Sequence, residues 1–444
     1  MQCILKVKSF LLRILLAGLL GASSTAFAAS NAPRFEGELI VVNKATEAEW
    51  AKFDGSNIAE LHIKGLIRTR ETAALWYVDS KSGAAFSAHQ LVRDLQRLAN
   101  TQNVYDVTAA VAQNADKSLV VTITVKDKWT LLPAFGVQGG GGSYVFGGGI
   151  QETNFAGLMV NSLFWLYNYN ESVSYDVFFG QDALLGSSYI AQLQFQRVVN
   201  PQAVSRRDGS SAGFFQWFRK TDEVMLGKNL PGPVRAMIFL DSYLDGLDAA
   251  TGVTASTYRG TQLALTPELI LGKVNVRDYL EEGSELTMKA SAINIGGSQP
   301  AYFSGTLSFK YCDIIHSKNN LAAWVEADVM SYGPTPYYSE VGGYATSRGF
   351  SDYRQAGPYR VFTNVEYRPL IGTTRWHLSD IDVLHPDLIA MQTVFFTDFG
   401  SAWGDPTLTG EPEMRNPLWL WSVGAGARVN FVKYAGAIMR LYVA

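Results

Sequence analysis

The chain has 444 residues, of which 17% are charged and 12% are aromatic, and its formal net charge is −3. This balance gives no basic footprint for nucleic acid, and the two cysteines and five histidines show no metal-ligand spacing. We therefore expect no nucleic-acid partner, no metal and no other cofactor. After residue 28 no apolar run reaches the length of about 18 residues that a membrane-spanning helix needs, which excludes a helical membrane protein.

The N-terminal residues 1–28 have the features of a secretory signal peptide. Basic residues precede an apolar run, Ile14 to Ala22, that is too short to span a bilayer as a helix, and an A-x-A pattern ends at Ala28. An anchor helix left in place is the alternative, but no long stop-transfer stretch follows. We expect residues 1–28 to be removed during export.

Residues 58–132 predict one small α+β domain in the order strand, helix, helix, strand, strand. Thr69 is expected to cap a short first helix, and Ser87 begins a capping box before a helix with leucines at positions i, i+4 and i+7. The three strand patterns lie at residues 58–64, 105–111 and 121–125. Residues 29–57 are left unassigned, although a capping box that begins at Thr46 allows one more short helix.

Residues 133–444 change to a period of two, which is typical of strands with one apolar and one polar face. The clearest alternation lies in residues 189–196, 285–292, 303–311 and 423–431. A soluble sandwich also alternates, but strands of about ten residues or more with Gln, Lys, Arg and Glu in mid-strand favour a membrane barrel around a wet lumen. At roughly 20 residues per strand and connection, this region holds about fifteen strands.

Four short motifs follow one another in this region: Gly149 to Gly157, then Arg348-Gly349-Phe350, then Glu366-Tyr367-Arg368, then Phe396-x-Asp398-x-Gly400. The ordered set resembles the BamA/TamA superfamily of outer-membrane insertases and translocators. Its members have an R-G-F-like loop, an E-Y-R-like strand end and an F-x-D-x-G strand, and the α+β segment is similar to a POTRA domain. The resemblance implies an all-β transmembrane barrel, about 16-stranded in the family, preceded by one small POTRA-like domain.

The resemblance also suggests a role for three charged residues. Strand parity places Glu366 and Asp398 on the polar faces of adjacent strands, where the two acids repel each other unless a cation lies between them. A guanidinium has five donors and can bridge two carboxylates. In the family, the corresponding arginine folds its loop into the lumen, so Arg348, Gly349 and Phe350 are assigned to a loop lock that Glu366 and Asp398 receive. The alternative is a solvated Arg348 and two acids that line a wet channel.

The sequence departs from the family pattern in two places. Ser347 stands where members usually have an apolar residue. Residues 424–431 and 437–444 look like the family's last two strands before the final one, and the expected final strand has no counterpart here. Because single-chain bacterial barrels have an even strand number, either the sequence is truncated or the barrel closes in another way.

The resemblance implies an outer-membrane protein assembly or polypeptide translocation factor. A POTRA-like domain in the periplasm would capture an unfolded outer-membrane or secreted polypeptide, by β-augmentation at residues 103–111 or in the neighbouring helix groove, and pass it to the barrel. Its partners would be these clients, outer-membrane lipids and periplasmic or lipoprotein factors.

The alternative is a passive outer-membrane channel or surface antigen, in which the domain is a periplasmic tether. We do not expect an enzyme, because no histidine stands in a recognisable catalytic pattern and no G-x-S-x-G motif is present.

Overall fold

The structure is a computed structural model. It describes residues 41–140, 143–169, 172–251, 258–294, 301–331, 338–343, 346–351, 354–376, 387–405, 411–434 and 438–443. The expected signal peptide, residues 1–28, and the first part of the segment 29–57 lie outside the described residues. Residues 35–444 form one compact unit. Among the described residues, no helix is both long enough and apolar enough to cross a membrane.

The first part of the unit is an α+β domain. Its elements are α2 (Lys44–Ala51), β1 (Ile58–Lys64), α3 (Glu71–Leu75), α4 (Ala88–Asn100), β2 (Val104–Gln113) and β3 (Leu119–Asp127). The sheet order is β1-β3-β2, in which β1 runs parallel and β2 antiparallel to β3. Helix α4 follows Ser87, whose hydroxyl accepts a hydrogen bond from the Gln90 amide, and its leucines Leu91, Leu95 and Leu98 are fully buried in the core of the domain.

Two helix starts differ from the sequence-based prediction. Helix α2 begins at Lys44 rather than after Thr46, because the Asn43 side chain caps it by accepting a hydrogen bond from the Thr46 amide. Thr69 does not cap α3, which has Arg70 at its N-cap and no side-chain cap. The Thr69 hydroxyl instead donates to the Asp127 carboxylate at 2.8 Å, a long-range partner that local pattern analysis does not reveal.

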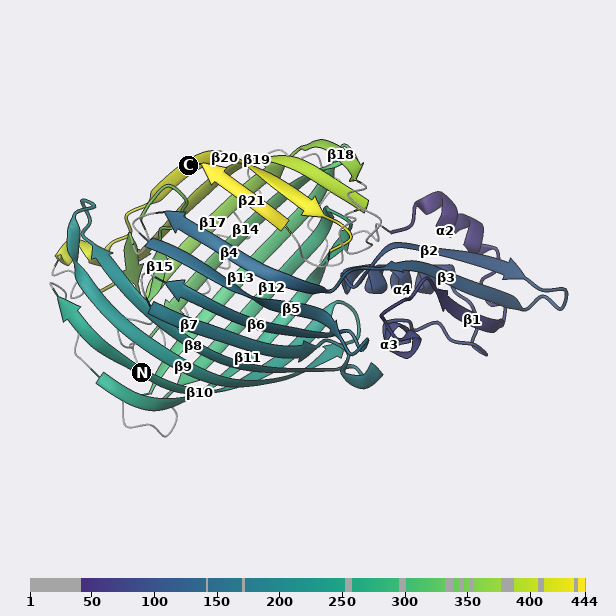
Figure 1. Ribbon diagram of the computed structural model, residues 1–444, viewed down its shortest axis with the longest axis horizontal. Coiled ribbons are helices and arrows are strands. Elements are labelled where there is room, and N and C mark those ends of the chain that lie inside the picture. Colours follow the sequence, from purple (N-terminus) through teal and green to yellow (C-terminus); the bar gives the residue numbers. More distant parts are fainter. Residues whose placement is uncertain are drawn as a thin grey trace. The chain divides into compact units, whose positions relative to one another are not determined.

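Most of the other described residues form one large antiparallel sheet that curls into a barrel (Figure 1). Its 16 strands are β4 (Leu131–Gly140), β5 (Ser143–Phe155), β6 (Val160–Tyr169), β7 (Ser172–Gln181), β8 (Tyr189–Ser205), β9 (Ser211–Leu230), β10 (Val234–Thr251), β11 (Tyr258–Arg277), β12 (Leu280–Ile293), β13 (Tyr302–Ile315), β14 (Asn319–Met330), β17 (Tyr359–Arg368), β18 (Leu370–Trp376), β19 (Asp387–Trp403), β20 (Leu420–Phe431) and β21 (Ile438–Val443). The expected all-β barrel is thus confirmed.

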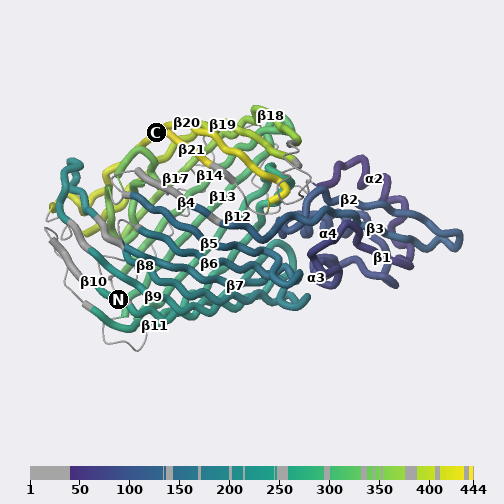
Figure 2. The backbone as a smooth tube through the Cα atoms, in the orientation of Figure 1, coloured from purple at the N-terminus to yellow at the C-terminus, as the bar shows by residue number. Residues whose placement is uncertain are grey.

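Strands pair with their neighbours in chain order from β4 to β21, as the colour gradient of the backbone shows (Figure 2). Both β17 and β18 pair with β19, so they act as one strand broken at Pro369. An isolated parallel bridge joins Trp129, before β4, to Tyr434, after β20, and brings the two ends of the sheet together on the side of the α+β domain. Among the described residues, β4 pairs only with β5 and β21 only with β20.

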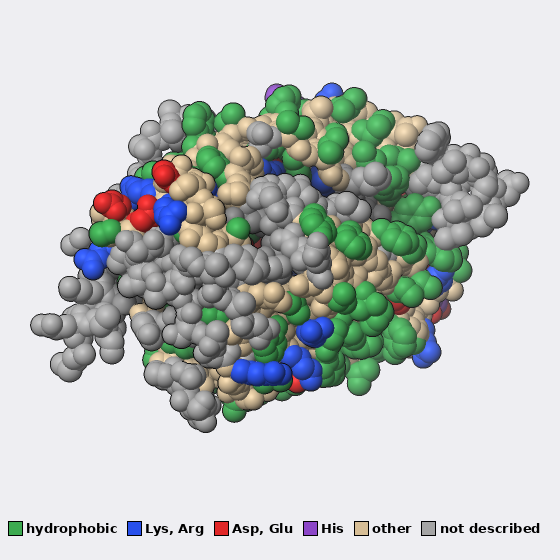
Figure 3. Space-filling model, turned by 60° about the vertical axis from the view of Figure 1, so that its left-hand side comes forward, with side chains coloured by type: hydrophobic (Ala, Val, Ile, Leu, Met, Phe, Trp, Pro, Cys, Tyr) green, Lys and Arg blue, Asp and Glu red, His purple; other side chains and the backbone are tan. Residues whose placement is uncertain are grey.

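The barrel strands have two chemically distinct faces. On β8, Leu193 and Phe195 are 44% and 43% exposed, whereas Gln192 and Gln194 point to the other face and bind acidic side chains of neighbouring strands. Large apolar side chains are likewise exposed on many other barrel strands, and Figure 3 shows hydrophobic side chains gathered over the outer wall. This pattern suits a barrel with hydrocarbon outside and polar groups inside.

Candidate functional site: a loop held inside the barrel

The candidate site lies where the long loop between β14 and β17 meets the inner wall. The loop contains a small hairpin, β15 (Ser339–Val341) and β16 (Gln355–Gly357). Its buried Val341 packs with Ala402 and Leu420 of the barrel, and Phe350 packs against this cluster. The loop is therefore held against the inner face of the last strands of the barrel.

Glycines let the loop turn sharply at this contact. Gly349 has a φ of +93°, a conformation in which a side chain would be strained. On the facing strand, a Cβ at Gly400 would lie 3.0 Å from the Val361 carbonyl oxygen and 3.3 Å from Val341, so glycine leaves room for the loop. Two glycines of the predicted motifs thus permit the close approach of loop and wall.

Arg348 is the centre of the contact. Its Nε and Nη2 donate to the two carboxylate oxygens of Asp398 at 2.9 and 2.8 Å, and its Nη1 donates to Glu366 at 2.8 Å. The Arg348 backbone amide also donates to Asp398, at 3.0 Å. This is a bidentate pair plus a second carboxylate, the geometry for which a planar guanidinium is suited. The structure thus brings together the three charged residues that the motifs singled out.

The surroundings of Arg348 are dry and aromatic. Arg348, Glu366 and Asp398 are 9%, 6% and 0% exposed. The guanidinium lies 3.5 Å from the ring centre of Phe396 and 4.7 Å from that of Tyr442 on β21. Phe396 of the F-x-D-x-G motif is therefore the stacking partner of the arginine. A buried charge is costly unless it is fully paired, and here each charged group has direct partners.

Ser347, next to the lock, occupies a fully buried position. Its hydroxyl has no hydrogen-bond partner among the described residues. A buried hydroxyl without a partner is costly, so an apolar side chain would also suit this position.

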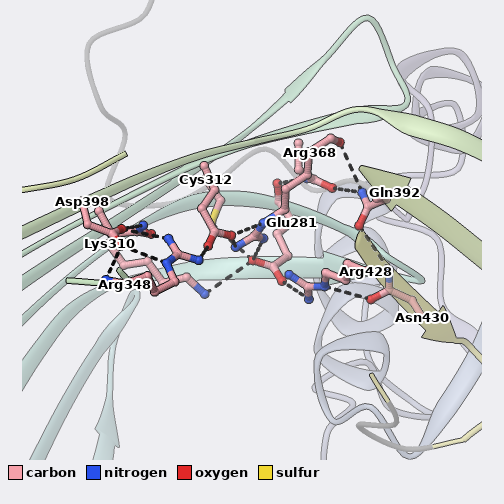
Figure 4. Close-up of polar contacts among 12 residues, drawn as sticks. Glu281, Lys310, Cys312, Arg348, Arg368, Gln392, Asp398, Arg428 and Asn430 are labelled. Atoms are coloured by element: carbon pink, nitrogen blue, oxygen red, sulfur yellow. Dashed lines mark hydrogen bonds and ion pairs between the residues drawn. The ribbon is translucent and has the colours of Figure 1, made fainter. Parts of the chain in front are cut away.

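The lock continues into a longer ionic network along the inner wall (Figure 4). Glu366 accepts from Arg368 at 2.8 Å, and Arg368 lies 3.6 Å from Glu281 of β12. Glu281 also faces Arg428 of β20 and Lys310 of β13, at 3.4 and 3.5 Å. The network therefore joins the loop to strands on both sides of β17.

Sequence reasoning did not find Glu281, Lys310 or Arg428, because their strands are far apart along the chain and no local motif marks them. Asn364 could have been found, since it shares the lumen-facing parity of Glu366 and donates to Asp398 at 2.6 Å. No group of three or more His, Cys, Asp or Glu residues able to hold a metal ion occurs among the described residues. The arrangement can hold a loop in place by charge pairing.

A second set of hydrogen bonds holds the far side of the loop. Arg354 donates to the carbonyl oxygens of Arg206 and Arg207, in the β8–β9 connection, at 2.7 Å each. Gln355 donates to the Leu418 carbonyl at 2.6 Å and accepts from the Ala402 amide at 3.0 Å. The loop is thus fixed both at Arg348 and at its return to the barrel.

Comparison with known structures identifies the fold. BamA from Haemophilus ducreyi lacking POTRA domains 1–3 is 15% identical to this chain, with a TM-score of 0.50. The match covers 84% of this chain and 78% of the BamA chain. CdiB from Acinetobacter baumannii is 13% identical, with 84% and 67% covered and a TM-score of 0.54. CdiB from Escherichia coli is 12% identical, with 88% and 73% covered and a TM-score of 0.57.

The chain has the fold of BamA and CdiB. The resemblance that the four motifs predicted is therefore confirmed at the level of the fold. Neither a protein-family model nor a curated protein sequence matches the chain.

The lock predicts a graded effect of substitution at Arg348. Arg348→Ala leaves Asp398 buried without a cation and leaves Glu366 with Arg368 alone, so we expect the barrel to fold but the loop to leave the wall. Arg348→Lys keeps the charge without the bidentate geometry and should release the loop only partly. Limited proteolysis of the folded protein measures the release. Equal protection of the loop in all three proteins would contradict the lock.

The network predicts that Glu281 matters more than a less enclosed acid on the same strand. Glu281→Gln leaves Arg368, Arg428 and Lys310 around an uncharged amide, and loss of a buried partner costs about 3–5 kcal/mol. Glu285→Gln is the matched control, since Glu285 pairs only with Arg235 among the ion pairs of the described residues and its side chain is 26% exposed. Urea unfolding in detergent should show the larger loss for Glu281→Gln. A larger loss for the control would contradict the network.

Proposed function

We propose that this chain is an outer-membrane protein assembly or polypeptide translocation factor. The observation that carries the proposal is the loop locked by Arg348 on Glu366 and Asp398, inside a barrel with the fold of BamA and CdiB. In this proposal the exposed apolar band of the barrel faces outer-membrane lipid, and the α+β domain lies in the periplasm. The proposal assigns no chemical reaction to the chain.

The proposed client is an unfolded outer-membrane or secreted polypeptide, and the α+β domain acts as the POTRA-like receiver. Strand β2 is the better candidate edge for β-augmentation. The other edge strand, β1, has amides that are already used: Leu61 donates to the Ser82 hydroxyl at 3.1 Å and Ile63 to Glu71 at 3.3 Å. Strand β2 has β3 as its only strand partner among the described residues, so its outer edge can add a further strand.

Quantitative mass spectrometry of isolated outer membranes tests the proposed function. We expect one or more barrel or secreted proteins to fall when the gene is deleted, and to return with the wild-type gene but not with Arg348→Ala. Complementation with Glu285→Gln, outside the lock, serves as the control for general damage to the barrel. An unchanged profile on deletion, with the protein present in the wild-type outer membrane, would contradict assembly or secretion and favour the passive channel or surface antigen.

Site-specific photocrosslinking tests client capture at β2. A photoreactive residue in place of the exposed Ala110 on β2 should crosslink to the clients that the deletion identifies. The same residue in place of the exposed His62 on β1 should crosslink far less, because that edge is already hydrogen-bonded. Equal yields from both positions, or none from Ala110, would contradict capture at this edge.

A further inference from the structure

The turn between β5 and β6 is built around Asn154, which lies in the first of the four motifs. The Asn154 backbone amide donates to the Glu152 carboxylate at 2.7 Å, and its side-chain oxygen accepts from the Met159 amide at 2.9 Å. These bonds close the turn and leave the side-chain amide nitrogen to a partner outside the barrel. That nitrogen donates to the Thr69 hydroxyl of the α+β domain at 2.8 Å.

Asp127 of the α+β domain orients the Thr69 hydroxyl for this bond. One oxygen of the buried Asp127 carboxylate accepts from the backbone amides of Ile67, Arg68 and Thr69 at 2.8, 2.6 and 2.9 Å. Its other oxygen accepts the Thr69 hydroxyl proton at 2.8 Å. The hydroxyl oxygen is therefore held with its lone pairs towards Asn154, as an acceptor in a fixed direction.

The backbones of domain and barrel also meet here. The Arg70 amide donates to the Gly157 carbonyl at 2.9 Å. A Cβ at Gly157 would lie 2.6 Å from the Arg68 carbonyl oxygen, and the φ of Gly157 is +74°. Thr69 and Asn154 are 6% and 5% exposed, so the contact excludes water. Unpaired polar groups at such a place are costly, which makes the contact specific.

A second contact joins helix α4 to the end of β11, next to the turn between β11 and β12. The Asn100 side chain accepts from the Val276 amide at 2.9 Å and donates to the Asn275 side chain at 3.0 Å. Gln96, one helical turn earlier and 1% exposed, donates to the Val276 carbonyl at 3.0 Å. Strands β7 to β10 separate this turn from the β5–β6 turn, so the two contacts hold the domain at distant points of the barrel rim.

We propose that Asn154 and Asn100 are positioning residues that dock the α+β domain on the barrel, so that the two move as one body. Docking at two separated points prevents rotation about the short chain segment between β3 and β4. The junction is dry, because Lys128 within that segment is only 7% exposed, and this burial lowers its pKa to about 8. Edge strand β2 is thereby held at a constant place relative to the barrel; this last consequence rests on the proposed function, whereas docking itself does not.

Distance measurements between spin labels test the docking directly. Labels at Ala110→Cys on β2 and Lys318→Cys on the β13–β14 turn, in a Cys312→Ser background, report the distance between domain and barrel. We expect a single narrow distance distribution for this reference protein. A broad distribution there would overturn the proposal.

Four variants identify the groups responsible. Asn154→Asp keeps the acceptor for the Met159 amide but loses the donor to the Thr69 hydroxyl. The double variant Asn154→Asp with Asn100→Ala should therefore broaden the distance distribution. Thr69→Ser keeps the hydroxyl and should stay narrow, whereas Thr69→Val with Asn100→Ala should broaden. Asn229→Ala is the matched control, because Asn229 donates to the Asp182 carbonyl within the barrel. A distribution that stays narrow in Asn154→Asp with Asn100→Ala would overturn the roles of these residues.

The spin labels report the distance between domain and barrel and not the level of any client. Either proposal can therefore be contradicted without the other. Loss of the narrow distribution in the Asn154 and Asn100 variants, with an unchanged outer-membrane profile on gene deletion, would support docking and contradict assembly.

Discussion

The guanidinium of Arg348 is the constraint on which the inner architecture of the barrel depends. It brings a positive charge from a loop to a wall that carries two buried carboxylates, and neither side is stable there without the other. The glycines at 349 and 400, the ring of Phe396 and the small hairpin β15–β16 all serve this approach. Three of the four motifs are therefore parts of one contact and not separate features.

The same physical rule governs the rest of the lumen. Paired strands satisfy one another's backbone groups, but inward side chains must be charged or polar to suit a wet interior, and each buried charge then needs a partner. Glu281, between three cations, extends the pairing from the lock to β12 and β20. Strands that are remote in sequence are thus tied together by charge as well as by their ladders of hydrogen bonds.

Much of the fold and part of the site could be predicted from the sequence. Period-two alternation reports which face of a strand is wet, and that parity placed Glu366 and Asp398 on the inner wall next to each other. The partners of Thr69 and Glu281 could not be predicted, because hydrogen bonds between residues distant in sequence leave no local pattern. The start of α2 was misjudged for a local reason: Asn43 and Thr46 both suit an N-cap, and the structure uses Asn43. The signal peptide remains a prediction.

A double-mutant cycle between Arg348 and Asp398 tests the central claim most directly. The free energy of opening the loop would be measured from protease protection in the wild-type protein, in Arg348→Ala, in Asp398→Ala and in the double variant. The account predicts strong coupling, on the order of 0.5–3 kcal/mol, so that the double variant is little worse than either single one. Additive effects of the two substitutions would show that Arg348 and Asp398 act independently, and would contradict a loop held by their pairing.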